Sequence, residues 1–205
     1  KTVLAGDRVL HAALRRARRH LRAGSEVART IRQGSRSLCF FLEHAITADQ
    51  LDTEAVRTHY CQLDDTDVLF SLKQWMQAED PVLADLARRF INRDFFRVTF
   101  LGDAPGTAQQ EAWAATVRRW LLGEGLSTPD TVEGDLPFYL HVDRSRHAAY
   151  ATNHDPIAIL DRSGTLRELS EMADTASIAG LDDTVVKPYV SYPKSAGVTV
   201  GEEAG

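Results

Sequence analysis

The sequence is poor in cysteine and contains no long apolar run. Its two cysteines, Cys39 and Cys61, stand alone without a CxxC pair, which argues against a disulfide framework and against a cysteine zinc site. Cys39 precedes apolar residues and is predicted to be buried. Because no stretch of about 18 apolar residues occurs, we expect neither a membrane-spanning helix nor a membrane partner. Unpaired cysteines suit a reducing compartment, so we expect a cytoplasmic protein.

The common catalytic motifs are also missing. The sequence has no GxSxG, Walker A, GxGxxG or HExxH pattern, so it identifies no catalytic residue and no metal ligand. His154-Asp155 lies in a polar loop and is interpreted as a turn. Asp64, Asp65 and Asp67 are explained more simply as helix caps than as a cation site. The glycine and glutamate of a calcium-binding loop are absent from this stretch.

Charge is distributed unevenly along the chain. Residues 1–38 carry +8 and the remaining residues −13, within a total of only −5 and a pI near 5.8. The acidic total argues against general nucleic-acid binding. A helix is predicted over residues 2–22, with an apolar face and an opposite basic face. The apolar face holds Val3, Leu10, Leu14, Ala17 and Leu21, and the basic face holds Lys1, Arg8, Arg15, Arg19 and Arg22. A solvated surface, a phosphate site and a subunit contact are all open interpretations of the basic face.

The pattern of apolar residues changes near residue 93. We predict an α+β fold with a helical region over 1–92 and a small α+β domain, with a mixed or antiparallel sheet, over 93–195. A disordered tail is expected over 196–205. Asp64 and Asp80-Pro81 are predicted to begin helices. Strands are expected over 95–101, 138–142, 157–160, 166–169 and 185–192, and a helix over 107–122.

Residues 63–101 carry a specific resemblance. The segments LDDTDVLFSLKQW, DPVLADL and FINRDFFRV are similar to those of HD-superfamily phosphohydrolases related to bacterial deoxynucleoside triphosphate triphosphohydrolases. The similarity extends over about residues 1–195. That family holds a divalent metal through a His, His-Asp, Asp set in an all-helical N-terminal domain, and none of those positions maps onto this chain. Because the chain also begins with Lys1 rather than Met, we expect a C-terminal half without catalytic or metal residues, with its metal in a preceding half.

The resemblance also implies roles for three cations. Positions matching Lys1, Arg93 and Arg97 touch nucleotide phosphates at a regulatory site between subunits in the related vertebrate enzyme. The chain is then expected to complete the hydrolase fold, to form homo-oligomer contacts and to hold the phosphate of a nucleotide effector. The alternatives are a non-catalytic module that docks its basic helix on an acidic partner, and a nucleic-acid-binding module. A nucleic acid is the less expected partner.

Overall fold

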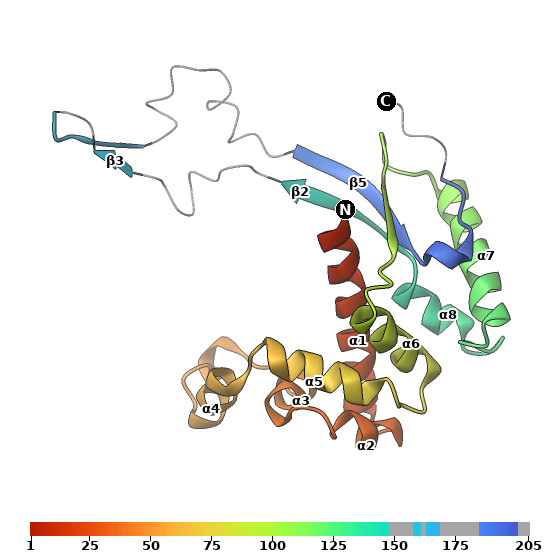
Figure 1. Ribbon diagram of the computed structural model, residues 1–205, viewed down its shortest axis with the longest axis horizontal. Coiled ribbons are helices and arrows are strands. Elements are labelled where there is room, and N and C mark those ends of the chain that lie inside the picture. Colours follow the sequence, from red (N-terminus) through yellow and green to blue (C-terminus); the bar gives the residue numbers. More distant parts are fainter. Residues whose placement is uncertain (148–157, 161–162, 169–184, 201–205) are drawn as a thin grey trace.

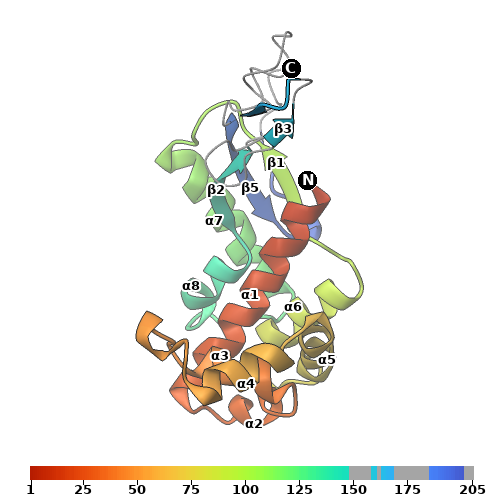
Figure 2. The same cartoon turned by 90° about the vertical axis from the view of Figure 1, so that its left-hand side faces the viewer.

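The computed structural model describes residues 1–147, 158–160, 163–168 and 185–200. The first half of the chain is helical and is built around the long helix α1, which runs from the sheet to α2 and α3 (Figures 1 and 2). The helices are α1 (Thr2–Ala23), α2 (Val27–Ile31), α3 (Arg36–Glu43), α4 (Glu54–Gln62), α5 (Asp65–Trp75) and α6 (Pro81–Ile91). A 3₁₀ turn, η1 (Ala48–Gln50), precedes α4.

The buried face of α1 differs from the predicted one. Its centre consists of small residues such as Ala5, Val9 and Ala13, and Val3 of the predicted apolar face is 79% exposed. The buried face is therefore turned by roughly a quarter of the helix circumference from the predicted one. Small side chains face the most crowded side because they let α6 approach closely. The two larger leucines, Leu10 and Leu14, are only partly buried at its margin.

Two predicted helix starts are confirmed. The Asp64 carboxylate accepts hydrogen bonds from the backbone N–H groups of Thr66 and Asp67, at 2.7 and 3.1 Å. The Asp67 carboxylate in turn accepts from the backbone N–H of Asp64 at 3.0 Å, which completes a capping box. Asp80 caps α6 by accepting from the Leu83 N–H at 3.0 Å, and Pro81 occupies the first helical position. The carboxylates at residues 64 and 67 are thus engaged in capping.

Gly34, between α2 and α3, permits a close approach to α5. A Cβ atom at this position would lie 2.7 Å from Ser71 Oγ and 2.9 Å from Ser71 Cβ. The same Ser71 hydroxyl accepts a hydrogen bond from the Ser35 N–H at 2.9 Å and donates to the Asp67 carbonyl at 2.7 Å. The glycine therefore allows one buried serine to join the α2–α3 turn to α5.

The second half forms a three-stranded antiparallel sheet. Strands β1 (Arg97–Phe100) and β2 (His141–His147) both pair with β5 (Val185–Tyr192), which lies between them. The α+β class is confirmed, and the sheet is antiparallel. The expected strand over 138–142 is wrong in its first part, because Leu136–Phe138 form a 3₁₀ turn, η2, and the strand begins at His141. The strands expected over 157–160 and 166–169 are present as β3 (Ala158–Leu160) and β4 (Leu166–Glu168), which pair with each other in an antiparallel hairpin.

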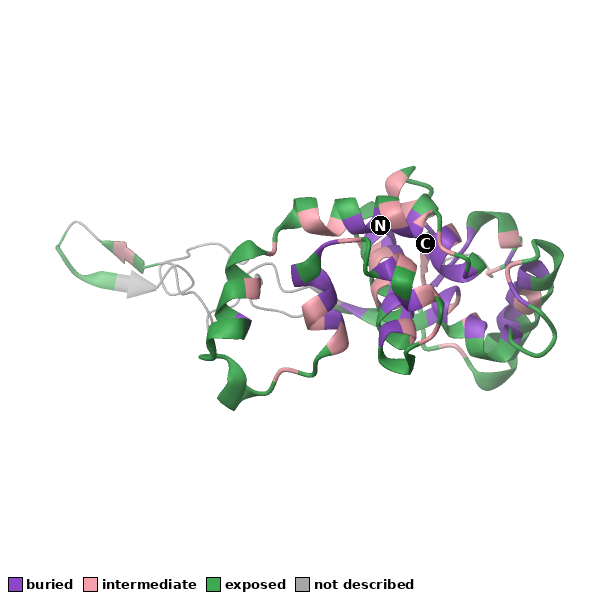
Figure 3. Ribbon diagram, turned by 90° about the horizontal axis from the view of Figure 1, so that it is seen from below, coloured by how far each residue is buried: buried purple, intermediate pink, exposed green. Residues whose placement is uncertain are grey.

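One face of the sheet is turned toward α1 and the other toward α7 (Thr107–Gly123). Successive residues of a strand point to opposite faces. Val98 and Tyr189 pack with Ala5 of α1, whereas Val190 and Tyr192 belong to the larger core that includes α7. The short helix α8 (Val132–Asp135) lies between α7 and η2. Buried residues are concentrated along these central elements (Figure 3).

The described part of the expected tail packs against α7. Residues 196–200 follow the 3₁₀ turn η5 (Lys194–Ala196), and Val198 is buried. The Trp113 indole N–H donates to the Thr199 carbonyl at 3.1 Å. Residues 201–205 lie outside the described residues, as do His154 and Asp155, which are interpreted from the sequence as part of a turn. Within the described residues, no helix is long and apolar enough to cross a membrane.

Candidate functional site

A buried ionic network joins α1 to both halves of the chain. The Arg16 guanidinium makes two hydrogen bonds to Asp80, from Nε at 2.8 Å and from Nη2 at 2.7 Å. Its Nη1 donates to Asp135 of α8 at 2.7 Å. The second Asp135 oxygen accepts from the Ser127 hydroxyl at 2.9 Å, and His20 Nε2 lies 3.2 Å from Asp80. The network therefore ties α1 to the start of α6 and to α8.

The protonation of this network is fixed by its geometry. Burial alone would raise the pKa of Asp80, but the hydrogen bonds from Arg16 and the nearby His20 hold it well below its usual range. Burial would likewise lower the pKa of Arg16, and the two carboxylates raise it instead. Both groups stay charged at neutral pH, which suits a structural tie and does not suit proton transfer. The sequence grouped Arg16 with the other basic residues of its segment and gave no signal of its distant partners.

The predicted basic face of α1 meets the sheet and the η2 turn. Arg8 donates to Asp143 of β2 at 2.6 Å, and its guanidinium lies 5.4 Å from the centre of the Tyr189 ring. Arg15 lies 5.5 Å from the centre of the Phe138 ring. Arg19 and Arg22 of the same face are exposed. The first two arginines are therefore held against other elements.

His141 is buried beneath this basic face. The residue is 8% exposed, and neither ring nitrogen has a hydrogen-bond partner. Burial lowers the pKa of His141 to about 4, and the positive charges of Arg8, Arg15 and His11 act in the same direction. The ring is neutral at pH 7 and retains one N–H group, which makes it a buried hydrogen-bond donor.

The three cations implicated by the family resemblance lie around β1. Lys1 Nζ lies 5.6 Å from the centre of the Phe100 ring, and Arg93 lies 5.9 Å from that of Phe95. Both rings pack against the first turns of α1. Arg97 is exposed, and strand alternation places it on the opposite face of β1 from Phe100. Lys1 and Arg93 are thus on the α1 side of the strand, and Arg97 is on the α7 side.

Arg93 has an unusual backbone. Its φ is 58°, the only positive φ at a non-glycine residue within the described ranges. The left-handed conformation is uncommon for side chains with a Cβ and is found where surrounding contacts impose it. Asp94, the next residue, is held by Arg89 at 2.7 Å. The backbone between α6 and β1 is therefore fixed, and so is the direction in which the Arg93 side chain leaves it.

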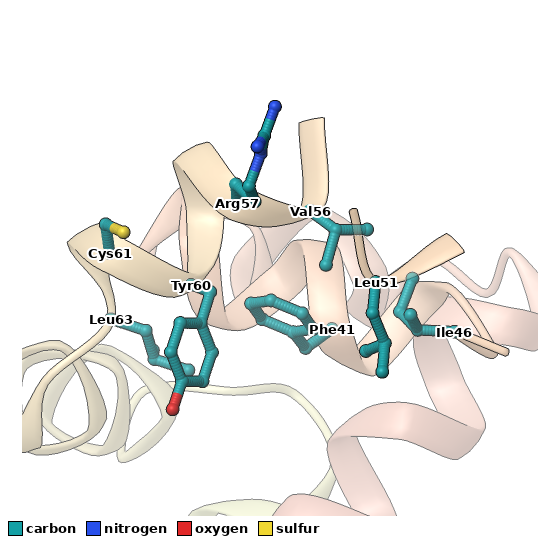
Figure 4. A pocket seen from close by; sticks show the side chains of 8 residues that line it. All are labelled: Phe41, Ile46, Leu51, Val56, Arg57, Tyr60, Cys61 and Leu63. Atoms are coloured by element: carbon teal, nitrogen blue, oxygen red, sulfur yellow. The ribbon is translucent and has the colours of Figure 1, made fainter. Parts of the chain in front are cut away.

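An apolar pocket lies at the far end of the helical half. It has a volume of about 570 Å³ and lies beside α4 and the segment before it (Figure 4). Tyr60 is 72% and Leu51 57% exposed at its edge, and Val56 is the only buried residue of α4. The lining residues are Phe41, Ile46, Leu51, Val56, Arg57, Tyr60, Cys61 and Leu63. Large exposed apolar side chains around a hollow are typical of an interaction surface.

The described residues contain no group of three or more His, Cys, Asp or Glu side chains that could hold a metal ion.

No protein-family profile matches the sequence. Over 144 residues, or 66% of the chain, the sequence is 33% identical to the uncharacterized protein YwfO of Bacillus subtilis (strain 168), and the match covers 30% of that protein. The chain therefore spans about a third of the length of this curated relative.

A crystal structure of a phosphohydrolase from Bacteroides thetaiotaomicron VPI-5482 has the same fold. The two chains align with a TM-score of 0.72 and 26% sequence identity. The alignment covers 94% of this chain and 45% of the phosphohydrolase. The helical and α+β halves described above therefore correspond together to less than half of a phosphohydrolase chain.

Proposed function

We propose that this chain is the C-terminal part of a metal-dependent HD phosphohydrolase that acts on nucleotides. The observation that carries the proposal is the structural match, which accounts for 94% of this chain but only 45% of a phosphohydrolase. The catalytic half would then precede residue 1 in the whole protein. It would hold the divalent metal, which activates water for attack on a phosphate. The present chain completes the fold and forms oligomer contacts.

The apolar pocket beside α4 supports this division. A pocket with large exposed apolar side chains is costly to leave in water, since burial stabilises by about 25 cal/mol per Å². The proposed occupant is an apolar surface of the catalytic half. Cys61 lines the pocket and is exposed, so its reactivity reports whether the pocket is covered.

The effector role suits a site between subunits. Lys1 and Arg93 lie on one side of β1 and Arg97 on the other, so a phosphate group that bridges two copies can use both sides. Arginine guanidinium groups bind phosphate oxygens in a forked geometry. The fixed backbone at Arg93 limits the orientations available to its side chain. We propose these three residues as the phosphate ligands of a nucleotide effector in a homo-oligomer.

Hydrolysis of deoxynucleoside triphosphates tests the division. The 205-residue chain with Mg²⁺, Mn²⁺ or Co²⁺ is expected to show no turnover, and a polypeptide that includes the preceding half is expected to be active. Clear metal-dependent turnover by the 205-residue chain would overturn the proposal.

Docking of the catalytic half on the apolar pocket is tested separately by alkylation of Cys61, which should slow when the catalytic half is present. Tyr60→Asp should abolish this protection, while Leu160→Asp, which is equally apolar and exposed but distant in β3, should retain it.

A further inference from the structure

The α1-facing side of the sheet contains a group of buried polar side chains without partners. His141 and Ser191 are paired in register on β2 and β5, so their side chains lie next to each other on one face. Neither imidazole nitrogen nor the Ser191 hydroxyl has a hydrogen-bond partner. Ser191 is fully buried, and His141 nearly so. Leaving such groups unpaired is unfavourable, because each has lost its hydrogen bonds to water without gaining a partner in the protein.

These groups can all donate hydrogen bonds. A neutral imidazole carries one N–H, and serine carries an O–H. Two neighbouring donors without partners are unusual, because most buried polar side chains in proteins have a partner. The sheet therefore offers a set of donors that matches a ligand rich in acceptor oxygens.

The charges that face His141 are mainly positive. From α1 they are Arg8, His11 and Arg15, and from β2 the acidic Asp143. Asp143 is already engaged by Arg8 at 2.6 Å. Phe96, the aromatic neighbour of His141, carries no charge. The two arginines outnumber the single carboxylate, so this part of the molecule favours an anion over a cation.

We propose that Arg8, His11 and Arg15 of α1, together with His141 and Ser191 of the sheet, bind a phosphate group of a small ligand. The two arginines of α1 supply positive charge, and His11 and the sheet supply neutral hydrogen-bond donors. Charged donors toward phosphate form short, strong hydrogen bonds. This site differs from the one proposed around Lys1, Arg93 and Arg97, and it needs neither catalysis nor docking of a catalytic half.

Binding at this site has a distinctive effect on protonation. Arg8 and Arg15 lower the pKa values of His141 and His11. The negative charge of a bound phosphate offsets this effect, so it raises the pKa of both histidines. The readout is the titration of the histidine rings, followed by NMR of ¹⁵N-histidine-labelled protein with and without tripolyphosphate or inorganic phosphate. A bound phosphate is expected to raise the His141 pKa by about one unit or more.

Three variants distinguish specific phosphate binding at this site from nonspecific attraction to the basic segment. Arg15→Gln removes one exposed cation and should weaken tripolyphosphate binding about tenfold, as loss of a charged hydrogen bond does. Ser191→Ala changes no charge and should weaken it about threefold or more through one lost donor. The control is Arg29→Gln, an exposed arginine on α2, which should leave binding unchanged.

Two results would overturn the proposal. One is an unchanged His141 titration at saturating tripolyphosphate. The other is equal weakening by Arg15→Gln and Arg29→Gln, which would indicate nonspecific attraction to the basic segment. A single-stranded oligonucleotide serves as the third probe. If it binds with a steep salt dependence and without moving the His141 resonance, the basic face is a nucleic-acid surface and not this site.

Discussion

Arg16 and Asp80 meet through two parallel hydrogen bonds, from Nε to Oδ2 and from Nη2 to Oδ1. The carboxylate also caps α6 by accepting from the Leu83 N–H. One buried side chain therefore starts a helix and anchors α1 at the same time. Asp135 accepts from the third guanidinium nitrogen, so the arginine links three elements that are far apart in the sequence.

Replacement of Arg16 should be strongly destabilising. Arg16→Met leaves Asp80 and Asp135 buried without their cation, and breaking a buried pair in this way costs about 3–5 kcal/mol. Urea denaturation should show this loss in the free energy of unfolding. Arg18→Met, at an exposed position on the same helix, should change it by less than about 0.5 kcal/mol. A loss below about 1 kcal/mol for Arg16→Met would show that the network contributes little to stability.

The buried histidine predicts a pH dependence of stability. The His141 pKa is lowered from 6.5 to about 4 in the folded protein, so between these values the unfolded chain binds more protons. The free energy of unfolding should therefore fall by about 3 kcal/mol as the pH decreases from about 7 to 4. The carboxyl group of Asp80 titrates below this window.

The same experiment on a variant identifies the group responsible. His141→Leu removes the titrating ring and should lose most of this slope in urea denaturation series recorded between the two pH values. His44→Leu, at an exposed histidine, should retain the slope. An unchanged slope in His141→Leu would assign the pH dependence to other groups.

Gly34 should tolerate no larger residue. The added Cβ of Gly34→Ala would meet Ser71 at 2.7–2.9 Å, and overpacking of this kind costs about 1–3 kcal/mol. At Gly102 nothing lies within 4 Å of an added Cβ, so Gly102→Ala is the matched control. The melting temperatures of the two variants are measured by thermal unfolding, and that of Gly34→Ala should be the lower. Similar melting temperatures would mean that α5 can shift away from the α2–α3 turn without cost.

The two cysteines should differ sharply in reactivity. Burial raises the pKa of Cys39 to about 11, with Glu43 acting in the same direction, whereas Cys61 is exposed. Since the thiolate is the reactive form, iodoacetamide at pH 8 should modify Cys61 first and Cys39 only after unfolding. Mass spectrometry of the modified peptides measures both rates. Equal rates in the native protein would contradict the burial of Cys39.

The sequence predicted best those features that depend on neighbouring residues. The Asp64 and Asp80 caps are local, because each carboxylate bonds backbone groups two or three residues away. The α+β class followed from the change of periodicity near residue 93. The fold class and most elements were therefore accessible without a structure.

The features that the sequence missed depend on distant packing. Arg16 forms hydrogen bonds to two residues that lie 64 and 119 positions away in the sequence, and no local sequence pattern indicates either partner. The large side chains of α1 indicated only one margin of its buried face: Ala17 and Leu21 are buried, but the centre of the face consists of small residues such as Ala5 and Ala13. Residues 138–142 resembled a strand, but Phe138 ends the 3₁₀ turn η2, whose first turn contains Pro137, and the strand begins only at His141. The orphaned donors around His141 exist only once β2 and β5 are paired.

The central position of β5 has a consequence for how the chain acquires its structure. Both edge strands, β1 and β2, pair with β5 and not with each other, although β5 is the last of the three in the sequence. The sheet therefore cannot form until residues 185–192 are present, roughly 40 residues after β2 and 90 after β1, whereas α6, the last helix to pack on α1 in the helical half, is complete at Ile91. During synthesis, the helical half can assemble first, and the sheet-facing side of α1 stays in water until β5 leaves the ribosome.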